Sequence, residues 1–143
     1  MAVGVKGVLY HVQINVGDAA ASLPFYRELL GYLEYRATSD DAGVAGFSDG
    51  RSDLWLIGTA PPHGDAGFHR KRTGLNHLAF RVGRREEVDR FAAEFLRARG
   101  LPALYGTPRE FPEYSPGYYA VFFEDPDRVK LEVAHVPRLG EVR

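Results

Sequence analysis

Two nine-residue segments of the chain share one pattern, and each carries a histidine at its third position. Residues 9–17 read LYHVQINVG and residues 75–83 read LNHLAFRVG, so that His77 lies 66 residues after His11. Imidazole shuttles protons near neutral pH and is a common ligand of divalent metals. Because an internal repeat indicates two copies of one supersecondary unit, the pattern places the two histidines at equivalent positions of two related strands.

A carboxylate on the last expected strand completes the set of residues that could hold a metal. Over residues 128–135 the apolar side chains alternate with Glu132, so that Glu132 faces away from them. The same alternation turns His11 and His77 away from the apolar faces of their strands. Two imidazoles and one carboxylate with open positions can bind a reactive metal ion. The alternative is a structural Glu paired with two buried histidines, since a buried carboxylate needs a partner.

The elements that must position these residues form two similar units. The first is expected to contain a helix that Asp18 caps and Gly31 ends, with strands over 7–16, 32–38, 43–49 and 52–58 and a turn at 39–41. The second is expected to contain a helix over 84–99 that Gly100 ends, with strands over 75–82, 102–106, 118–124 and 128–135, and a surface loop over 108–117. The order in each unit is strand, helix and three strands. The sequence therefore predicts one α+β domain over 1–143, with βαβββ modules at about 7–58 and 74–136 and a linker over 59–73.

Composition limits the classes of partner and metal. The 18 basic and 19 acidic residues nearly balance, which argues against nucleic acid as a partner. The only locally basic run, residues 69–72, is expected to be a solvated loop. No apolar run is long enough to span a membrane and no signal pattern opens the chain, so a cytoplasmic location is expected. Without cysteine, a metal would need His, Asp, Glu or water, which suits Fe, Mn, Zn, Ni or Co.

The chain resembles the vicinal oxygen chelate superfamily, which includes glyoxalase I, extradiol dioxygenases, fosfomycin-resistance enzymes, methylmalonyl-CoA epimerase and bleomycin-resistance proteins. The resemblance covers nearly the whole chain, and the segments that carry it are His11 with residues 16–31, residues 76–80 (NHLAF) and residues 123–132 (FEDPDRVKLE). It implies two modules that form a half-open barrel around one divalent ion. It also implies that His11, His77 and Glu132 are the ligands, and that the substrate is a small molecule with adjacent oxygens.

The chain departs from individual members of this superfamily at two positions. Trp55 stands where glyoxalase I has a fourth, carboxylate ligand, and indole cannot replace it, so glyoxalase I activity is disfavoured. Phe122 stands where extradiol dioxygenases have a tyrosine, which mildly favours a lyase or isomerase over a dioxygenase. No acid–base residue is assigned, and the candidates are His63 and Tyr118.

Several other side chains are candidates for contact with the substrate. They share the face of the metal residues, surround the expected cavity or belong to the loop near it, and are Gln13, Asn15, Trp55, Arg81, Tyr114 and Phe122. The resemblance implies a homodimer, in which the modules pair within one chain or exchange between two. The alternative function is a metal-free protein of the bleomycin-resistance type that sequesters a ligand.

Overall fold

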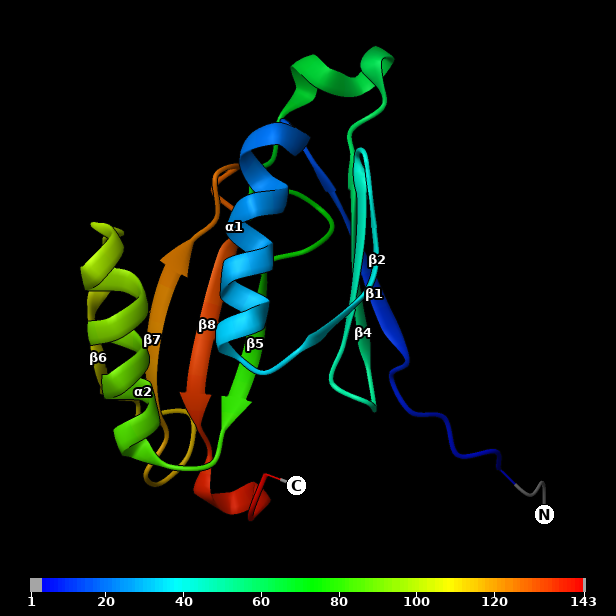
Figure 1. The fold of residues 1–143 in the computed structure, drawn as a ribbon. Helices are drawn as coiled ribbons and strands as arrows, with labels where there is room; N and C mark the ends of the chain where they lie inside the picture. The colour runs from blue at the N-terminus through cyan, green and yellow to red at the C-terminus, as the bar shows by residue number, and fades with distance from the viewer. Residues whose placement is uncertain (1–3, 143) are drawn as a thin grey trace. The chain divides into compact units, whose positions relative to one another are not determined.

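The computed structural model describes residues 4–142. The chain forms two compact units, Met1–Ala66 and Gly67–Arg143. Their boundary falls within the segment predicted to link the modules. Figure 1 shows a sheet and a helical segment in each unit, and each unit has the predicted order along the chain of strand, helix and three strands. In the described part of the chain, no helix has the length and apolar character needed to cross a membrane.

The first unit is a βαβββ module with a four-stranded mixed sheet. Its strands lie in the order β1-β4-β3-β2, with β1 parallel to β4 and the other pairs antiparallel. The elements are β1 (His11–Val16), α1 (Ala19–Tyr32), β2 (Arg36–Asp41), β3 (Val44–Ser48) and β4 (Asp53–Gly58), followed by the 3₁₀ helix η1 (Pro61–Ala66). Asp18 caps α1, since its Oδ1 accepts a hydrogen bond from the amide of Ala20 at 2.9 Å.

The second unit repeats this arrangement. Its sheet has the order β5-β8-β7-β6, and β5 is parallel to β8 as β1 is to β4. The elements are β5 (His77–Val82), α2 (Arg85–Phe91), the π-helical turn η2 (Ala92–Leu96), the 3₁₀ turn η3 (Arg97–Arg99), β6 (Leu104–Glu110), β7 (Tyr119–Glu124), β8 (Lys130–His135) and the 3₁₀ turn η4 (Pro137–Leu139). The predicted α+β fold of two βαβββ modules is confirmed.

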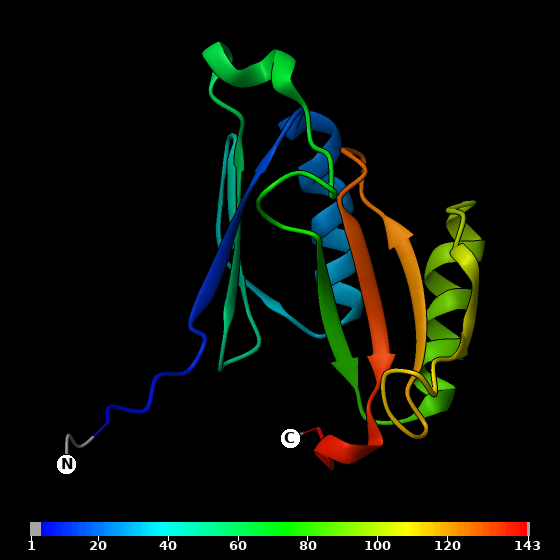
Figure 2. The ribbon, with the colours of Figure 1, turned by 180° about the vertical axis from the view of Figure 1, so that it is seen from behind.

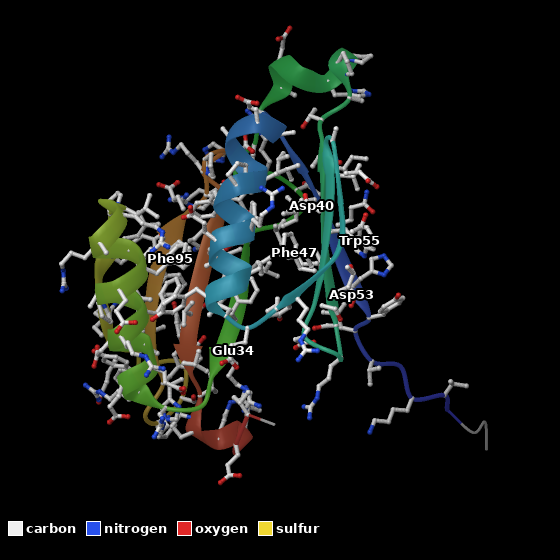
Figure 3. All side chains as sticks on the ribbon, in the orientation of Figure 1. Glu34, Asp40, Phe47, Asp53, Trp55 and Phe95 are labelled. Carbon is white, nitrogen blue, oxygen red and sulfur yellow. The ribbon has the colours of Figure 1, made fainter. Side chains whose placement is uncertain are left out.

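The helical segment of the second unit covers one face of its sheet with aromatic rings. Phe91 stacks on Phe95 with ring centroids 5.1 Å apart and lies 5.2 Å from the ring of Phe123 on β7. All three side chains are buried, and Figure 3 shows Phe95 on the side of the helix next to the sheet. Gly100 ends the segment in the left-handed conformation, as predicted, with φ 65°. This apolar layer leaves the opposite face of the sheet for the residues that could do chemistry.

Several predicted boundaries in the first unit are wrong. The first strand begins at His11 rather than at residue 7. Gly31 lies inside α1, and the left-handed residue after the helix is Glu34, with φ 65°. The predicted turn at 39–41 belongs to β2, because Gly43 reaches a positive φ of 85° and supplies the tight reversal two residues later.

In the second unit, the predicted boundary between strand and loop is wrong at β6, which contains a bulge. β6 extends to Glu110, so the first residues of the predicted 108–117 loop are strand. The pairing of β6 with β7 is interrupted between Leu104 and Arg109, where the backbone bulges. Thr107 holds this bulge, since its hydroxyl donates to the carbonyl of Leu104 at 2.6 Å and accepts from the amide of Phe122 at 3.0 Å. A bulge stabilised by one hydroxyl leaves no periodic signal in the sequence.

Candidate metal centre

His77 and Glu132 meet on the face of the second sheet that α2 leaves uncovered. Nε2 of His77 lies 3.2 Å from Oε2 of Glu132. Because β5 and β8 are parallel and Ala79 is the register partner of Glu132, the imidazole and the carboxylate reach toward each other diagonally across the two strands. The carboxylate is buried at 2% exposure, whereas the imidazole is 35% exposed. The pair is thus open to solvent from the histidine side only.

Asn76 fixes the orientation of this imidazole. Nδ1 of His77 lies 2.7 Å from Oδ1 of Asn76, a carbonyl oxygen that can only accept, so Nδ1 is the donor. Nε2 therefore directs either a lone pair or a second proton at Glu132. Two ligand atoms bound to one divalent ion at about 2.0–2.2 Å are roughly 3 Å apart, which agrees with the observed separation. The donor set, one imidazole held by an outer hydrogen bond and one carboxylate, suits a divalent metal.

Tyr118 holds the other oxygen of the carboxylate. Its hydroxyl donates to Oε1 of Glu132 at 2.5 Å. Burial, together with the hydrogen bond to Glu132, raises the pKa of Tyr118 well above its usual value. The phenol therefore stays protonated at neutral pH and acts as a donor that positions Glu132, not as a general base.

The surroundings of Glu132 on this face are apolar. Phe122 is its register partner on β7, is buried, and places its ring edge-on to the imidazole of His77 with centroids 6.0 Å apart. The rest of the cluster around Phe122 consists of Phe111, Ala120, Ala134 and Val136, with Leu104 and Tyr118 packed against it. A carboxylate in such surroundings is costly unless cations or donors compensate it. Here the hydroxyl of Tyr118 and the imidazole of His77 are the groups that compensate it.

In the first unit, the positions equivalent to His77 and Glu132 are occupied by His11 and Trp55. His11 is the first residue of β1, as His77 is of β5, and its side chain is exposed. Trp55 is the register partner of Gln13, two residues after His11, as Glu132 is the partner of Ala79, two residues after His77. The register therefore places Trp55 at the position equivalent to Glu132.

Gly46 makes room for this indole. It is the register partner of Trp55, and a Cβ added to it would lie 2.7 Å from Cζ3 of Trp55 and 2.9 Å from Oγ1 of Thr38. The neighbouring Phe47 is buried, and Figure 3 shows Phe47 and Trp55 on opposite sides of this sheet. The glycine thus allows a large ring to lie flat over the strand, on the face that carries His11.

Replacing Gly46 by Ala is expected to destabilise the first unit, because the new methyl group must displace either the indole or the strand. We expect a loss of about 1–3 kcal/mol in the free energy of unfolding, as for other overpacked sites. Urea unfolding followed by the fluorescence of Trp55, the only tryptophan, measures it. Gly64→Ala is the matched control, since nothing lies within 4 Å of its added Cβ. Equal stability of the two variants would contradict the assigned packing.

The remaining predicted residues lie in varied settings. Gln13 and Asn15 are exposed on β1, on the face of His11, and His63 is exposed in η1. Arg81 donates to the carbonyls of Gly140 at 3.1 Å and Glu141 at 3.4 Å, so its guanidinium holds the C-terminal segment. Tyr114 is 59% exposed and stacks on Phe111, with centroids 5.1 Å apart.

Within residues 4–142 no three metal-ligating side chains are gathered together. Of the three predicted ligands, the structure brings only His77 and Glu132 into contact.

The sequence interpretation missed the role of Asn76. A polar neighbour of a histidine is a weak signal, and the first copy of the repeat has Tyr10 at that place, with its ring edge-on to His11 at 4.8 Å. Only the backbone path before β5 shows that the amide of Asn76 reaches the imidazole.

Comparison with known proteins identifies the family. The model of the Glyoxalase/Bleomycin resistance protein/Dioxygenase superfamily matches residues 8–133. The chain belongs to this superfamily. A relative in Bacillus subtilis (strain 168), the uncharacterized protein YqjT, is 38% identical over 128 residues, which cover 87% of this chain and 96% of the relative.

Solved structures of the superfamily share the fold. A candidate glyoxalase from Bacillus halodurans is 40% identical, covers 92% of this chain and 97% of its own, and superposes with a TM-score of 0.83. Lactoylglutathione lyase from Agrobacterium tumefaciens is 20% identical with a TM-score of 0.65, covering 91% of this chain and 94% of its own. The second likeness shows the fold alone.

Proposed function

We propose that the chain is a divalent-metal-dependent enzyme that acts on a small molecule with adjacent oxygens. The observation that carries the proposal is the arrangement at Glu132. This buried carboxylate lies 3.2 Å from an imidazole that Asn76 orients, and a neutral phenol holds its second oxygen. In metal sites, hydrogen bonds from neighbouring residues hold the ligating imidazole and carboxylate in place. Asn76 and Tyr118 supply such hydrogen bonds to His77 and Glu132.

The proposed ligands are His77 and Glu132 from the second module and His11 from the first. His11 belongs to the set because the repeat gives it the strand position of His77 and the same exposed orientation. The metal is one of Fe, Mn, Zn, Ni or Co, and when bound it supplies a Lewis acid for the substrate oxygens. Modules of one chain, or of two chains in a homodimer, bring the three ligands together.

The residues around the ligands define the class of reaction. Trp55 takes the place of a fourth carboxylate, so that glyoxalase I chemistry, which uses that group for proton transfer, is not proposed. Tyr118 orients Glu132 and keeps its proton. Phe122 keeps water away from the carboxylate, and its apolar ring favours a lyase or isomerase over an extradiol dioxygenase. Oxygen consumption with catechols separates these two classes of enzyme.

The proposed function is tested by metal analysis of protein purified without added metal. We expect close to one transition-metal ion per chain in the wild type and little in His77→Ala. His135→Ala is the matched control and should keep its metal, because His135 is the last residue of β8 and has the opposite parity to Glu132. Negligible metal in all three proteins would instead support the second candidate, a ligand-sequestering protein of the bleomycin-resistance type.

Tyr118→Phe is expected to weaken metal binding by about 10–100-fold, because it removes an outer hydrogen bond to a ligand. The fold should persist, since only one hydroxyl is lost. Competition with a chromophoric chelator for Zn²⁺ measures the affinity. Tyr114→Phe, which removes a hydroxyl from an exposed ring in the same cluster, serves as the control, and equal affinities of the two variants would show that Tyr118 does not position Glu132.

A further inference from the structure

A basic pocket lies wholly within the second unit, beside the segment that leads into β5. It has a volume of about 210 Å³ and is lined by Phe68, His69, Arg70, Lys71 and Arg128. The sequence alone assigned residues 69–72 to a solvated loop. Residues 69–72 do lie in a largely exposed loop. Figure 2 shows that this segment before β5 lies beside the turn that joins β7 to β8, so that cationic side chains from two distant segments gather at one place.

One carboxylate holds the two arginines of this pocket in place. Oε2 of Glu124 accepts from Nη1 of Arg70 at 2.8 Å and from Nε of Arg128 at 3.2 Å. Arg70 also reaches the carbonyl of Arg128 at 3.4 Å, and no carboxylate in the described part of the chain pairs with Lys71. The two arginines therefore share one carboxylate, and within residues 4–142 the terminal nitrogens of Arg128 make no hydrogen bond, so they stay available to a ligand.

Arg128 has a backbone conformation that favours glycine. Arg128 has φ 67°, in the left-handed region where glycine is relaxed and a residue with a Cβ is not. Asp125 imposes this turn, since its Oδ1 accepts from the amides of Asp127 and Val129, each at 2.8 Å. Because glycine would be more favourable here, the role of the arginine side chain can be tested separately from that of the backbone.

The pocket is coupled to the candidate metal centre through one residue. Nδ2 of Asn76 donates to the carbonyl of Arg70 at 3.3 Å, while its Oδ1 orients the imidazole of His77 at 2.7 Å. An anion bound to Arg70 would therefore lie next to Asn76, the residue that orients the imidazole of His77.

We propose that this pocket binds an oxyanion group, a phosphate, phosphonate or carboxylate. Guanidinium and ammonium groups recognise such groups through charge-assisted hydrogen bonds, and a volume of about 210 Å³ accommodates one such group with adjoining atoms. That the oxyanion is part of the substrate rests on the proposed function. Binding of the anion does not, because none of the pocket residues is a proposed metal ligand.

The experiment titrates the full chain, stripped of metal, with inorganic phosphate at constant ionic strength. Calorimetry or amide NMR shifts report the affinity, and malonate in a second arm distinguishes a phosphate site from a carboxylate site. We expect saturable binding of one of the two anions. Arg128→Gly and, separately, Lys71→Gln should each weaken it by about tenfold or more, as when a charged hydrogen bond is lost.

Arg128→Gly separates the ligand role from a structural one. Because glycine relaxes the left-handed backbone, its melting temperature should be unchanged or higher while anion binding falls. Glu34→Gly, at another exposed left-handed position with φ 65°, should likewise keep or raise the melting temperature and leave anion binding unchanged. Absence of saturable binding for both anions, or wild-type affinity in Arg128→Gly, would overturn the proposal.

The outcome is independent of the proposed function. His77→Ala should lose its metal and keep the anion affinity of the wild type, whereas Arg128→Gly should keep its metal and bind the anion about tenfold or more weakly. Metal retained in His77→Ala would count against the metal site, and wild-type anion affinity in Arg128→Gly would count against the anion pocket.

Discussion

Glu132→Gln is expected to lower the affinity for Zn²⁺ by at least about 100-fold, more than loss of an outer hydrogen bond does. The amide has the shape of the carboxylate but carries no charge, so it is a far weaker ligand for a divalent cation. Its carbonyl can still accept from Tyr118, and burying a neutral group avoids the desolvation of an anion. The variant should therefore fold at least as well as the wild type. Chelator competition gives the affinity, and thermal unfolding gives the stability.

The matched control for this substitution is Glu110→Gln. Glu110 is an exposed carboxylate at the end of β6, in the same unit, and it pairs with Arg85 rather than with a histidine. Its loss should leave metal affinity unchanged. If Glu132→Gln bound Zn²⁺ as tightly as the control, the buried carboxylate would be a structural partner of His77 and not a ligand.

Phe91→Ala is expected to cost about 3–5 kcal/mol of the free energy of unfolding. Phe91 is 1% exposed, and its ring contacts those of Phe95 and Phe123, so truncation leaves a cavity between the helix and the sheet. That loss is a large part of the stability of an ordinary domain. Urea unfolding monitored by circular dichroism measures it.

Leu139→Ala provides the comparison for the core substitution. Leu139 is 52% exposed in η4, so its truncation removes little buried surface and should cost less than about 1 kcal/mol. A similar small loss for Phe91→Ala would mean that the aromatic layer does not hold α2 on its sheet.

Periodicity in the sequence was enough to find the chemistry-bearing face. The alternation of apolar residues set His77 and Glu132 on one face of adjacent parallel strands, and the structure brings their polar atoms to 3.2 Å. The resemblance to glyoxalase I placed Trp55 at a ligand position of that enzyme, and the strand register of the structure makes Trp55 equivalent to Glu132. A side-chain period of two is a strong signal because one sheet face is covered by a helix.

Contacts between distant segments could not be predicted in this way. Arg70 and Arg128 lie far apart along the chain, and only the path of the segment before β5 brings both to Glu124. The role of Asn76 depends on the same path. The left-handed Glu34 after α1 was missed because a glycine is the usual residue there, and Gly31 was taken for it.

We propose that His11 of the first module is a ligand of the same metal ion as His77 and Glu132. The most direct test is Zn²⁺ affinity of chelator-stripped His11→Ala, measured by competition beside the wild type and His77→Ala. We predict that His11→Ala loses affinity as severely as His77→Ala, by at least about 100-fold. Wild-type affinity in His11→Ala would contradict the three-ligand site.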